Sequence, residues 1–120
     1  MALTDNIVGY WKFDGNADDS VGSNDGTVSG CTNDVAYGKI NGGYLSDAAA
    51  EYIEVPYAAA LELTGDMSFS FWYYPTSFKN YSMFFTMTHI PTTYAAPFSI
   101  WIIAGGYIKF ILGHSAGQQS

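Results

Sequence analysis

Apolar and polar side chains alternate with a period of two along much of this chain. The clearest case is residues 67–74, in which one alternate set is entirely apolar: Met67, Phe69, Phe71 and Tyr73. Successive side chains of a β-strand point to opposite faces of a sheet, whereas a helical face repeats every three to four residues. The alternation therefore predicts a chain built mainly of strands, with sheets packed on one face and partly covered on the other.

Several segments carry this strand pattern, and glycine-rich turns separate some of them. Gly105 and Gly106 lie between two apolar runs, which indicates a hairpin. Only residues 58–63 are expected to form a short helical turn. The expected strands are residues 7–13, 44–46, 52–56, 67–74, 82–88, 97–103 and 107–112.

The length of the chain, 120 residues, gives room for one domain, residues 1–120, with a hydrophobic core. Burying one large aromatic side chain contributes about 1.5 to 3 kcal/mol to stability. We expect this core to centre on four such side chains: Trp11, Phe13, Phe69 and Phe71.

Acidic residues outnumber basic ones and lie only in the first part of the chain. There are 11 of them against four lysines, no acid follows Asp66, and the formal net charge is -7. Nucleic acids and anionic membrane surfaces attract clusters of Lys and Arg, so neither is expected as a partner. Apolar runs are shorter than the ~18 residues of a spanning helix, so membrane insertion is not expected either.

Four segments of the chain match, in order, the motifs of one protein family. They are GYWKFD at residues 9–14 with DSVGSNDGT at 19–27, GKINGGYLS at 38–46, YIEVP at 52–56, and LELTGDMSFSFW at 61–72. Through these motifs the chain resembles a laminin G-like, concanavalin A-like lectin domain.

The resemblance implies an all-β fold, an antiparallel jelly-roll β-sandwich. Domains of this family continue with further strands beyond the point at which this sequence ends, and their last strand pairs near their first. We expect the missing strands either to belong to a longer protein, of which this chain is a fragment, or to come from another copy or another chain.

The loop after residue 13 is dense in oxygen ligands, which calcium prefers. The resemblance suggests that Asp19, Asn24 and Asp25 occupy motif positions of a loop that in relatives is sometimes a structural calcium site. The alternative is that the same side chains cap backbone amides of the loop. Both interpretations stay open on the sequence.

Catalytic chemistry is not expected. Jelly-roll glycoside hydrolases place two carboxylates on one strand at a fixed spacing. Glu51, Glu54 and Glu62 do not have that spacing, and the odd separation of Glu51 and Glu54 would send them to opposite faces of a strand. His89 and His114 have no evident nucleophile beside them.

Glycan binding calls for exposed aromatic residues beside polar groups on loops. Tyr74, Tyr81 and Tyr94 lie near threonine and asparagine residues and suit that role, although for each single tyrosine we favour packing in a core or interface. Cys31 is the single cysteine, so it forms no internal disulfide, and we interpret it as a small residue in a turn.

These features favour a non-enzymatic structural or adhesive module of an extracellular assembly. The first residues lack the pattern of a signal peptide, which favours a phage virion protein (tail, fibre or capsid decoration) over an ordinarily secreted lectin. Expected partners are other subunits, further copies of the chain and surface glycans. The alternatives are a carbohydrate-binding module of a larger secreted protein and a subunit of an extracellular filament.

Overall fold

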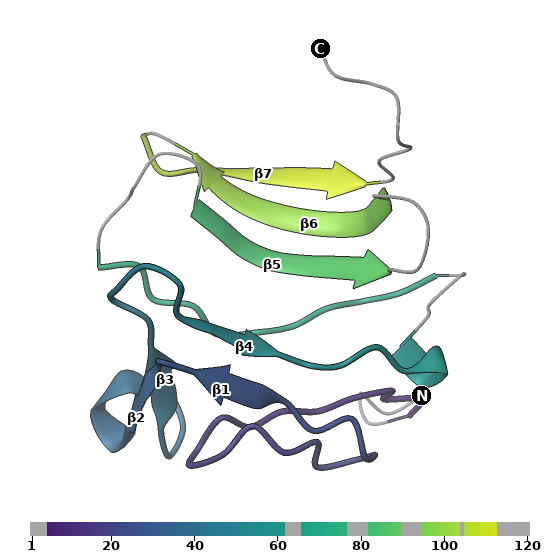
Figure 1. Cartoon of the computed structure of the whole chain (residues 1–120), viewed down its shortest axis with the longest axis horizontal. Helices are drawn as coiled ribbons and strands as arrows, with labels where there is room; N and C mark the ends of the chain where they lie inside the picture. Colours follow the sequence, from purple (N-terminus) through teal and green to yellow (C-terminus); the bar gives the residue numbers. More distant parts are fainter. Residues whose placement is uncertain (1–4, 62–65, 77–81, 90–94, 104, 113–120) are drawn as a thin grey trace. The chain divides into compact units, whose positions relative to one another are not determined.

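A computed structural model gives the structure of the chain (Figure 1). The chain forms two compact units, Met1–Trp72 and Tyr73–Ser120, and each is described by itself. The residues that the structure describes are 5–61, 66–76, 82–89, 95–103 and 105–112.

The first unit contains two small antiparallel sheets, each made of two three-residue strands. In one sheet, β1 (Thr27–Ser29) pairs with β4 (Tyr52–Glu54). In the other, β2 (Thr32–Asp34) pairs with β3 (Gly43–Leu45). Strands this short leave most of the unit to loops, so hydrogen bonds made by loop side chains carry much of its order.

Two single turns of 3-10 helix follow β2 and β4. They are η1 (Val35–Tyr37) and η2 (Ala59–Leu61). Asp34 is the N-cap residue of η1, because its carboxylate accepts a hydrogen bond from the Ala36 amide at 2.8 Å. In the part of the chain that the structure describes, no helix has the length and apolar character needed to cross a membrane.

The second unit contains one antiparallel sheet with the strand order β5-β6-β7 (Figure 1). Its strands are β5 (Ser82–His89), β6 (Ala95–Ile103) and β7 (Tyr107–Leu112). β6 and β7 form a hairpin, in which Gly105 and Gly106 have φ angles of 87° and 80°. Residues 104–106 connect the two strands, and the Gly106 amide donates to the Ile103 carbonyl at 3.1 Å. Glycine adopts the positive φ angles of this turn without strain.

The all-β prediction is confirmed, and five expected strands appear within two residues of their expected bounds. The hairpin at Gly105 and Gly106 is also confirmed. The helical turn expected at residues 58–63 is present as η2, and its end lies outside the described residues. Strands β1 and β2 were not expected.

The strand expected at residues 7–13 is absent. Only Trp11 forms a β-bridge, with Asp19, and Phe13 has a φ of 58°, which interrupts an extended backbone. The Trp11 ring folds back over Gly9 so closely that a Cβ atom on Gly9 would overlap with it, and its Nε1 donates to the Asn24 carbonyl at 2.8 Å. The loop after residue 13, called the acidic loop from here on, therefore orders this segment. No long partner strand does so.

The strand expected at residues 67–74 is absent as well, because these residues have no regular secondary structure. Phe69 and Phe71 are 39% and 50% exposed, whereas Trp11 and Phe13 are half-buried. The predicted core of four aromatic residues is therefore wrong. Alternation makes a strand possible, but side chains are buried only where that strand pairs and packs on a second layer.

The most buried apolar residues of the described chain are instead Ala17, Ile100 and Ile102, at 3%, 3% and 4% exposure. Ile100 and Ile102 lie on one face of β6, the middle strand of its sheet. A middle strand has neighbours on both sides, so its side chains lose more contact with water than those of an edge strand.

We predict that Ile100→Ala destabilises the protein by about 2 to 5 kcal/mol, because it leaves a cavity at a position that is only 3% exposed. The matched control is Ile108→Ala on β7, where the side chain is 60% exposed and the loss should be about 0.5 kcal/mol. Urea unfolding followed by circular dichroism measures both. Equal losses for the two variants would contradict this description of the core.

Candidate functional site

The acidic loop folds back on the segment that precedes it. The Ser20 amide donates to the Tyr10 carbonyl at 2.8 Å, beside the bridge between Trp11 and Asp19. Further along the loop, the Gly26 amide donates to the Ala17 carbonyl at 2.8 Å. These contacts bring the side chain of Asp19 inside the loop, where only 7% of the residue is exposed.

Both carboxylate oxygens of Asp19 are occupied by N–H donors. Oδ1 accepts from the amides of Tyr10 at 3.0 Å and Val21 at 3.1 Å. Oδ2 accepts from the Asn24 amide at 3.3 Å and from Asn24 Nδ2 at 3.1 Å. A carboxylate offers about four acceptor positions, so this one is saturated by the loop itself.

Asp25 supports the same arrangement from the other side. Its Oδ1 accepts a hydrogen bond from the Asp19 amide at 2.9 Å. Gly22 matters because a Cβ atom there would lie 2.7 Å from Asp19 Oδ2. Gly22, Asp19 and Asp25 therefore belong to one compact hydrogen-bonded arrangement within the DSVGSNDGT segment.

Burial would by itself raise the pKa of Asp19, because the charged form loses hydration. Amides of Tyr10, Val21 and Gly22 donate to the charged form and lower the pKa, and so does the Asn24 side chain. The hydrogen bonds outweigh burial and hold the pKa of Asp19 well below its ordinary value. Asp19 is therefore a permanently charged cap at neutral pH.

The structure thus brings together the three loop residues predicted from the sequence, Asp19, Asn24 and Asp25. Their contacts favour the capping interpretation, because a cation would have to displace N–H donors from Asp19. Within the described residues, no three His, Cys, Asp or Glu side chains are grouped so that they could hold a metal ion. Calcium at this loop stays a prediction.

The residues predicted for glycan binding are not assembled into a site by the described structure. Tyr74 is 85% exposed in a segment without regular secondary structure. Tyr81 and Tyr94 lie outside the described residues. The role of these three tyrosines stays a prediction.

Glu51 has a local structural role. One of its carboxylate oxygens accepts hydrogen bonds from the amides of Asp47 at 2.7 Å and Ala48 at 3.1 Å, which closes the turn before β4. Glu54 lies on β4 opposite Thr27. Glu62 and His114 lie outside the described residues, and His89 is the last residue of β5.

Cys31 lies between β1 and β2, next to Gly30 with its φ of 77°, in agreement with the turn predicted there. Burial raises the pKa of the thiol, and the negative charge of Glu51 raises it further. A raised pKa reduces the reactive thiolate fraction at neutral pH, which suits a structural role.

A second feature was not predicted from the sequence. Four side chains on one face of β6 and β7 line a shallow, open hollow of about 150 Å³: Trp101, Ile103, Lys109 and Ile111. The hairpin register was the signal that could have revealed it. In that register, which is centred on Gly105, Ile103 pairs with Tyr107 and Trp101 lies directly opposite Lys109.

Comparisons with protein-family models, with curated proteins and with solved structures found no match to this chain. The two features are therefore interpreted from their own geometry.

We predict that Asp19→Asn lowers the free energy of unfolding by about 1 to 3 kcal/mol at pH 7, because it removes a charged acceptor and leaves buried amides poorly paired. The control is Asp18→Asn, since Asp18 is exposed and its carboxylate accepts a hydrogen bond from the neighbouring, exposed Asn16 side chain. That variant should unfold like the wild type in urea.

The difference between wild type and Asp19→Asn should shrink in acid. A depressed folded pKa stabilises the protein fully above the unfolded pKa of about 3.9, and the contribution is lost as the pH falls through the folded value. A difference that stays constant from neutral pH down to about pH 2, well below that unfolded pKa, would contradict the assigned charge.

The calcium hypothesis is decided by thermal melting with calcium and with a chelator. A cation that binds only the folded state stabilises it by about 2.7 kcal/mol at a hundredfold excess over its dissociation constant. On the geometry of Asp19 we expect the melting temperature to be the same in both solutions. A rise with calcium that Asp25→Asn abolishes would restore the metal site and overturn the capping interpretation.

Proposed function

We propose that this chain is a non-enzymatic structural or adhesive β-sandwich module of an extracellular assembly, such as a phage tail, fibre or capsid decoration protein. The jelly-roll sandwich rests on the resemblance of four ordered motifs to laminin G-like domains. The central activity of such a module is assembly, in which it contributes surfaces that other copies of the chain cover.

One observation carries this proposal, namely the exposure of large apolar side chains on β7. Ile108 and Phe110 are 60% and 61% exposed, and they lie on the same face of the strand. Tyr107, on the opposite face, is 68% exposed. Monomeric proteins seldom leave such side chains clustered in water, so their clustering supports an interface.

The position of β7 in its sheet supports the same conclusion. β7 is one edge of the β5-β6-β7 sheet, and its six residues pair with β6 without a register shift. β5, the other edge, is irregular at two places. Bulges protect an edge from pairing with another chain, whereas a regular edge invites it. The regular edge is the one that carries the exposed apolar residues.

Charge supports contacts between copies through the second unit. After Asp66 the sequence has no acid and only two lysines, so two second units repel each other weakly. The first units carry the net negative charge of the chain. Association through β7 therefore brings together the part of the chain that is least charged.

We predict that the chain self-associates at concentrations of about 10 to 100 µM, which correspond to the weak end of specific association. Sedimentation velocity should detect oligomers of the wild type. The double variant Ile108→Lys and Phe110→Lys should weaken association at least about tenfold, because charges on an edge strand oppose pairing.

The matched control is Val35→Lys in η1, where the side chain is 78% exposed in the first unit. It should leave the association unchanged. A wild type that stays monomeric, or a control that dissociates as the double variant does, would refute the proposed assembly.

A further inference from the structure

One apolar face of the β5-β6-β7 sheet is buried on β6 and exposed on β7. The register places Ile100 directly opposite Phe110, and it places Ile102 opposite Ile108 in the same way. The two β6 side chains are 3% and 4% exposed, whereas their neighbours on β7 are 61% and 60% exposed. Burial therefore stops at the β7 edge, and a further strand beside β7 would continue it.

The free edge of β7 can supply the backbone hydrogen bonds for such a strand. Every second residue of an edge strand turns its N–H and C=O groups away from the strand that it already pairs with. β7 pairs with β6 without a register shift, so no bulge interrupts this row of donors and acceptors. The row matches an identical edge that is related to it by a two-fold rotation. A second copy of this chain therefore fits the edge.

Symmetry limits the ways in which two β7 strands can pair. A two-fold axis perpendicular to the sheet makes the strands antiparallel and keeps each side chain on its own face. Residues directly opposite each other point to the same face, so one residue must lie opposite its own copy. Only two such registers leave a single residue of each β7 strand unmatched. They are centred on Lys109, which leaves out Leu112, and on Phe110, which leaves out Tyr107.

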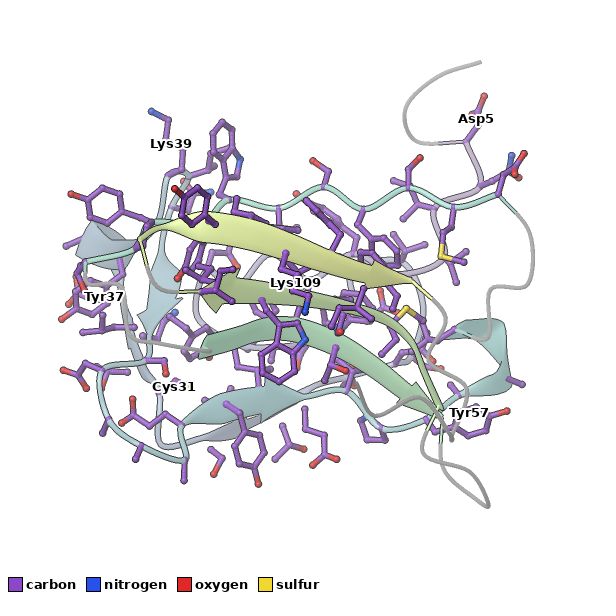
Figure 2. All side chains as sticks on the ribbon, turned by 90° about the horizontal axis from the view of Figure 1, so that it is seen from above. Asp5, Cys31, Tyr37, Lys39, Tyr57 and Lys109 are labelled. Atoms are coloured by element: carbon purple, nitrogen blue, oxygen red, sulfur yellow. The ribbon has the colours of Figure 1, made fainter. Side chains whose placement is uncertain are left out.

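Charge decides between these two registers. Lys109 is exposed and lies over one face of the β5-β6-β7 sheet (Figure 2). In the register centred on Lys109, the two ammonium groups lie directly opposite each other, and like charges at such positions oppose pairing. The sequence of the second unit, Tyr73–Ser120, contains neither Asp nor Glu that could offset two facing lysines.

The register centred on Phe110 avoids that repulsion. It places each Lys109 opposite Ile111 of the other copy, and it places the two Phe110 rings opposite each other. Aromatic pairs directly across an antiparallel ladder stabilise a sheet. The same register brings the exposed apolar side chains of the two β7 strands onto one shared face.

We propose that two copies of this chain pair through β7 in the antiparallel register centred on Phe110, so that their sheets join into one continuous sheet. Phe110 then lies at the two-fold axis, and Ile108 of each copy extends the apolar face that begins on β6. The inference rests on the proposed function, because it requires association through β7. It adds the partner strand, the symmetry and the register.

Disulfide cross-linking between copies determines the register. All variants carry Cys31→Ser, so that an introduced cysteine is the single thiol. Opposite residues have Cα atoms about 4.5 to 5.5 Å apart, within the span of a disulfide of about 4.4 to 6.8 Å, whereas diagonal neighbours are about 7 to 8 Å apart. Oxidation by copper phenanthroline in air should therefore cross-link Phe110→Cys at the concentrations at which the wild type associates.

The matched control is an equal mixture of Tyr107→Cys and Ile111→Cys, which keeps Lys109 in place. These two positions lie opposite each other in the register centred on Lys109, and they are diagonal neighbours in the proposed register. Their mixed disulfide, identified by mass, should form at least about tenfold more slowly than the Phe110→Cys disulfide. Adding Lys109→Met to the mixture should speed it about twofold to fivefold, because the like charges no longer oppose the other register.

The unsubstituted chain gives a second measurement of the register. In a mixture of isotope-labelled and unlabelled protein, filtered NMR spectra should show contacts between Lys109 of one copy and Ile111 of the other. Contacts between Tyr107 and Ile111 of different copies would indicate the register centred on Lys109 and overturn the inference.

The outcomes also separate this inference from the proposed assembly. The register is overturned, while the assembly stands, if sedimentation velocity shows oligomers but Phe110→Cys does not cross-link, or if the control mixture cross-links as fast. It is overturned as well if Lys109→Met leaves the rate of the mixed disulfide unchanged. A wild type that stays monomeric overturns both the assembly and the register.

Discussion

The first unit depends on one buried charge, the carboxylate of Asp19. Its strands are three residues long, so the sheets alone define little of the chain path. Asp19 joins the amides of Tyr10 and Val21 to the Asn24 side chain, and the indole of Trp11 closes the same loop on the Asn24 carbonyl. Hydrogen bonds to a charged acceptor are stronger than neutral ones, which is why one residue can organise a loop of this length.

The second unit is ordered by the pairing of long strands. Its secondary structure was therefore easier to predict from the sequence. β5, β6 and β7 are long enough to show alternation, and Gly105 with Gly106 indicated the hairpin between β6 and β7. Residues 67–74 show the limit of that reasoning. Their alternation is as clear as that of β7, yet they form no regular strand, because alternation describes two faces and not the partner that must cover one of them.

The acidic loop was only half predictable. Its residue types indicated an oxygen-rich cluster, and Asp19, Asn24 and Asp25 do meet in the structure. Which groups their oxygens bind depends on the approach of residues 10 and 11, which the sequence pattern assigned to a strand. The hollow at Trp101 was missed because it is made by two strands in register, and neither strand carries a motif by itself.

Amide hydrogen exchange at Tyr10, Val21 and Asn24 tests the central role of Asp19 most directly. We predict that these amides, although they lie in segments without regular secondary structure, exchange slowly in the wild type and become fast together in Asp19→Asn. The β7 amides should be unaffected by that substitution. Fast exchange at Tyr10, Val21 and Asn24 in the wild type would contradict the central role of Asp19.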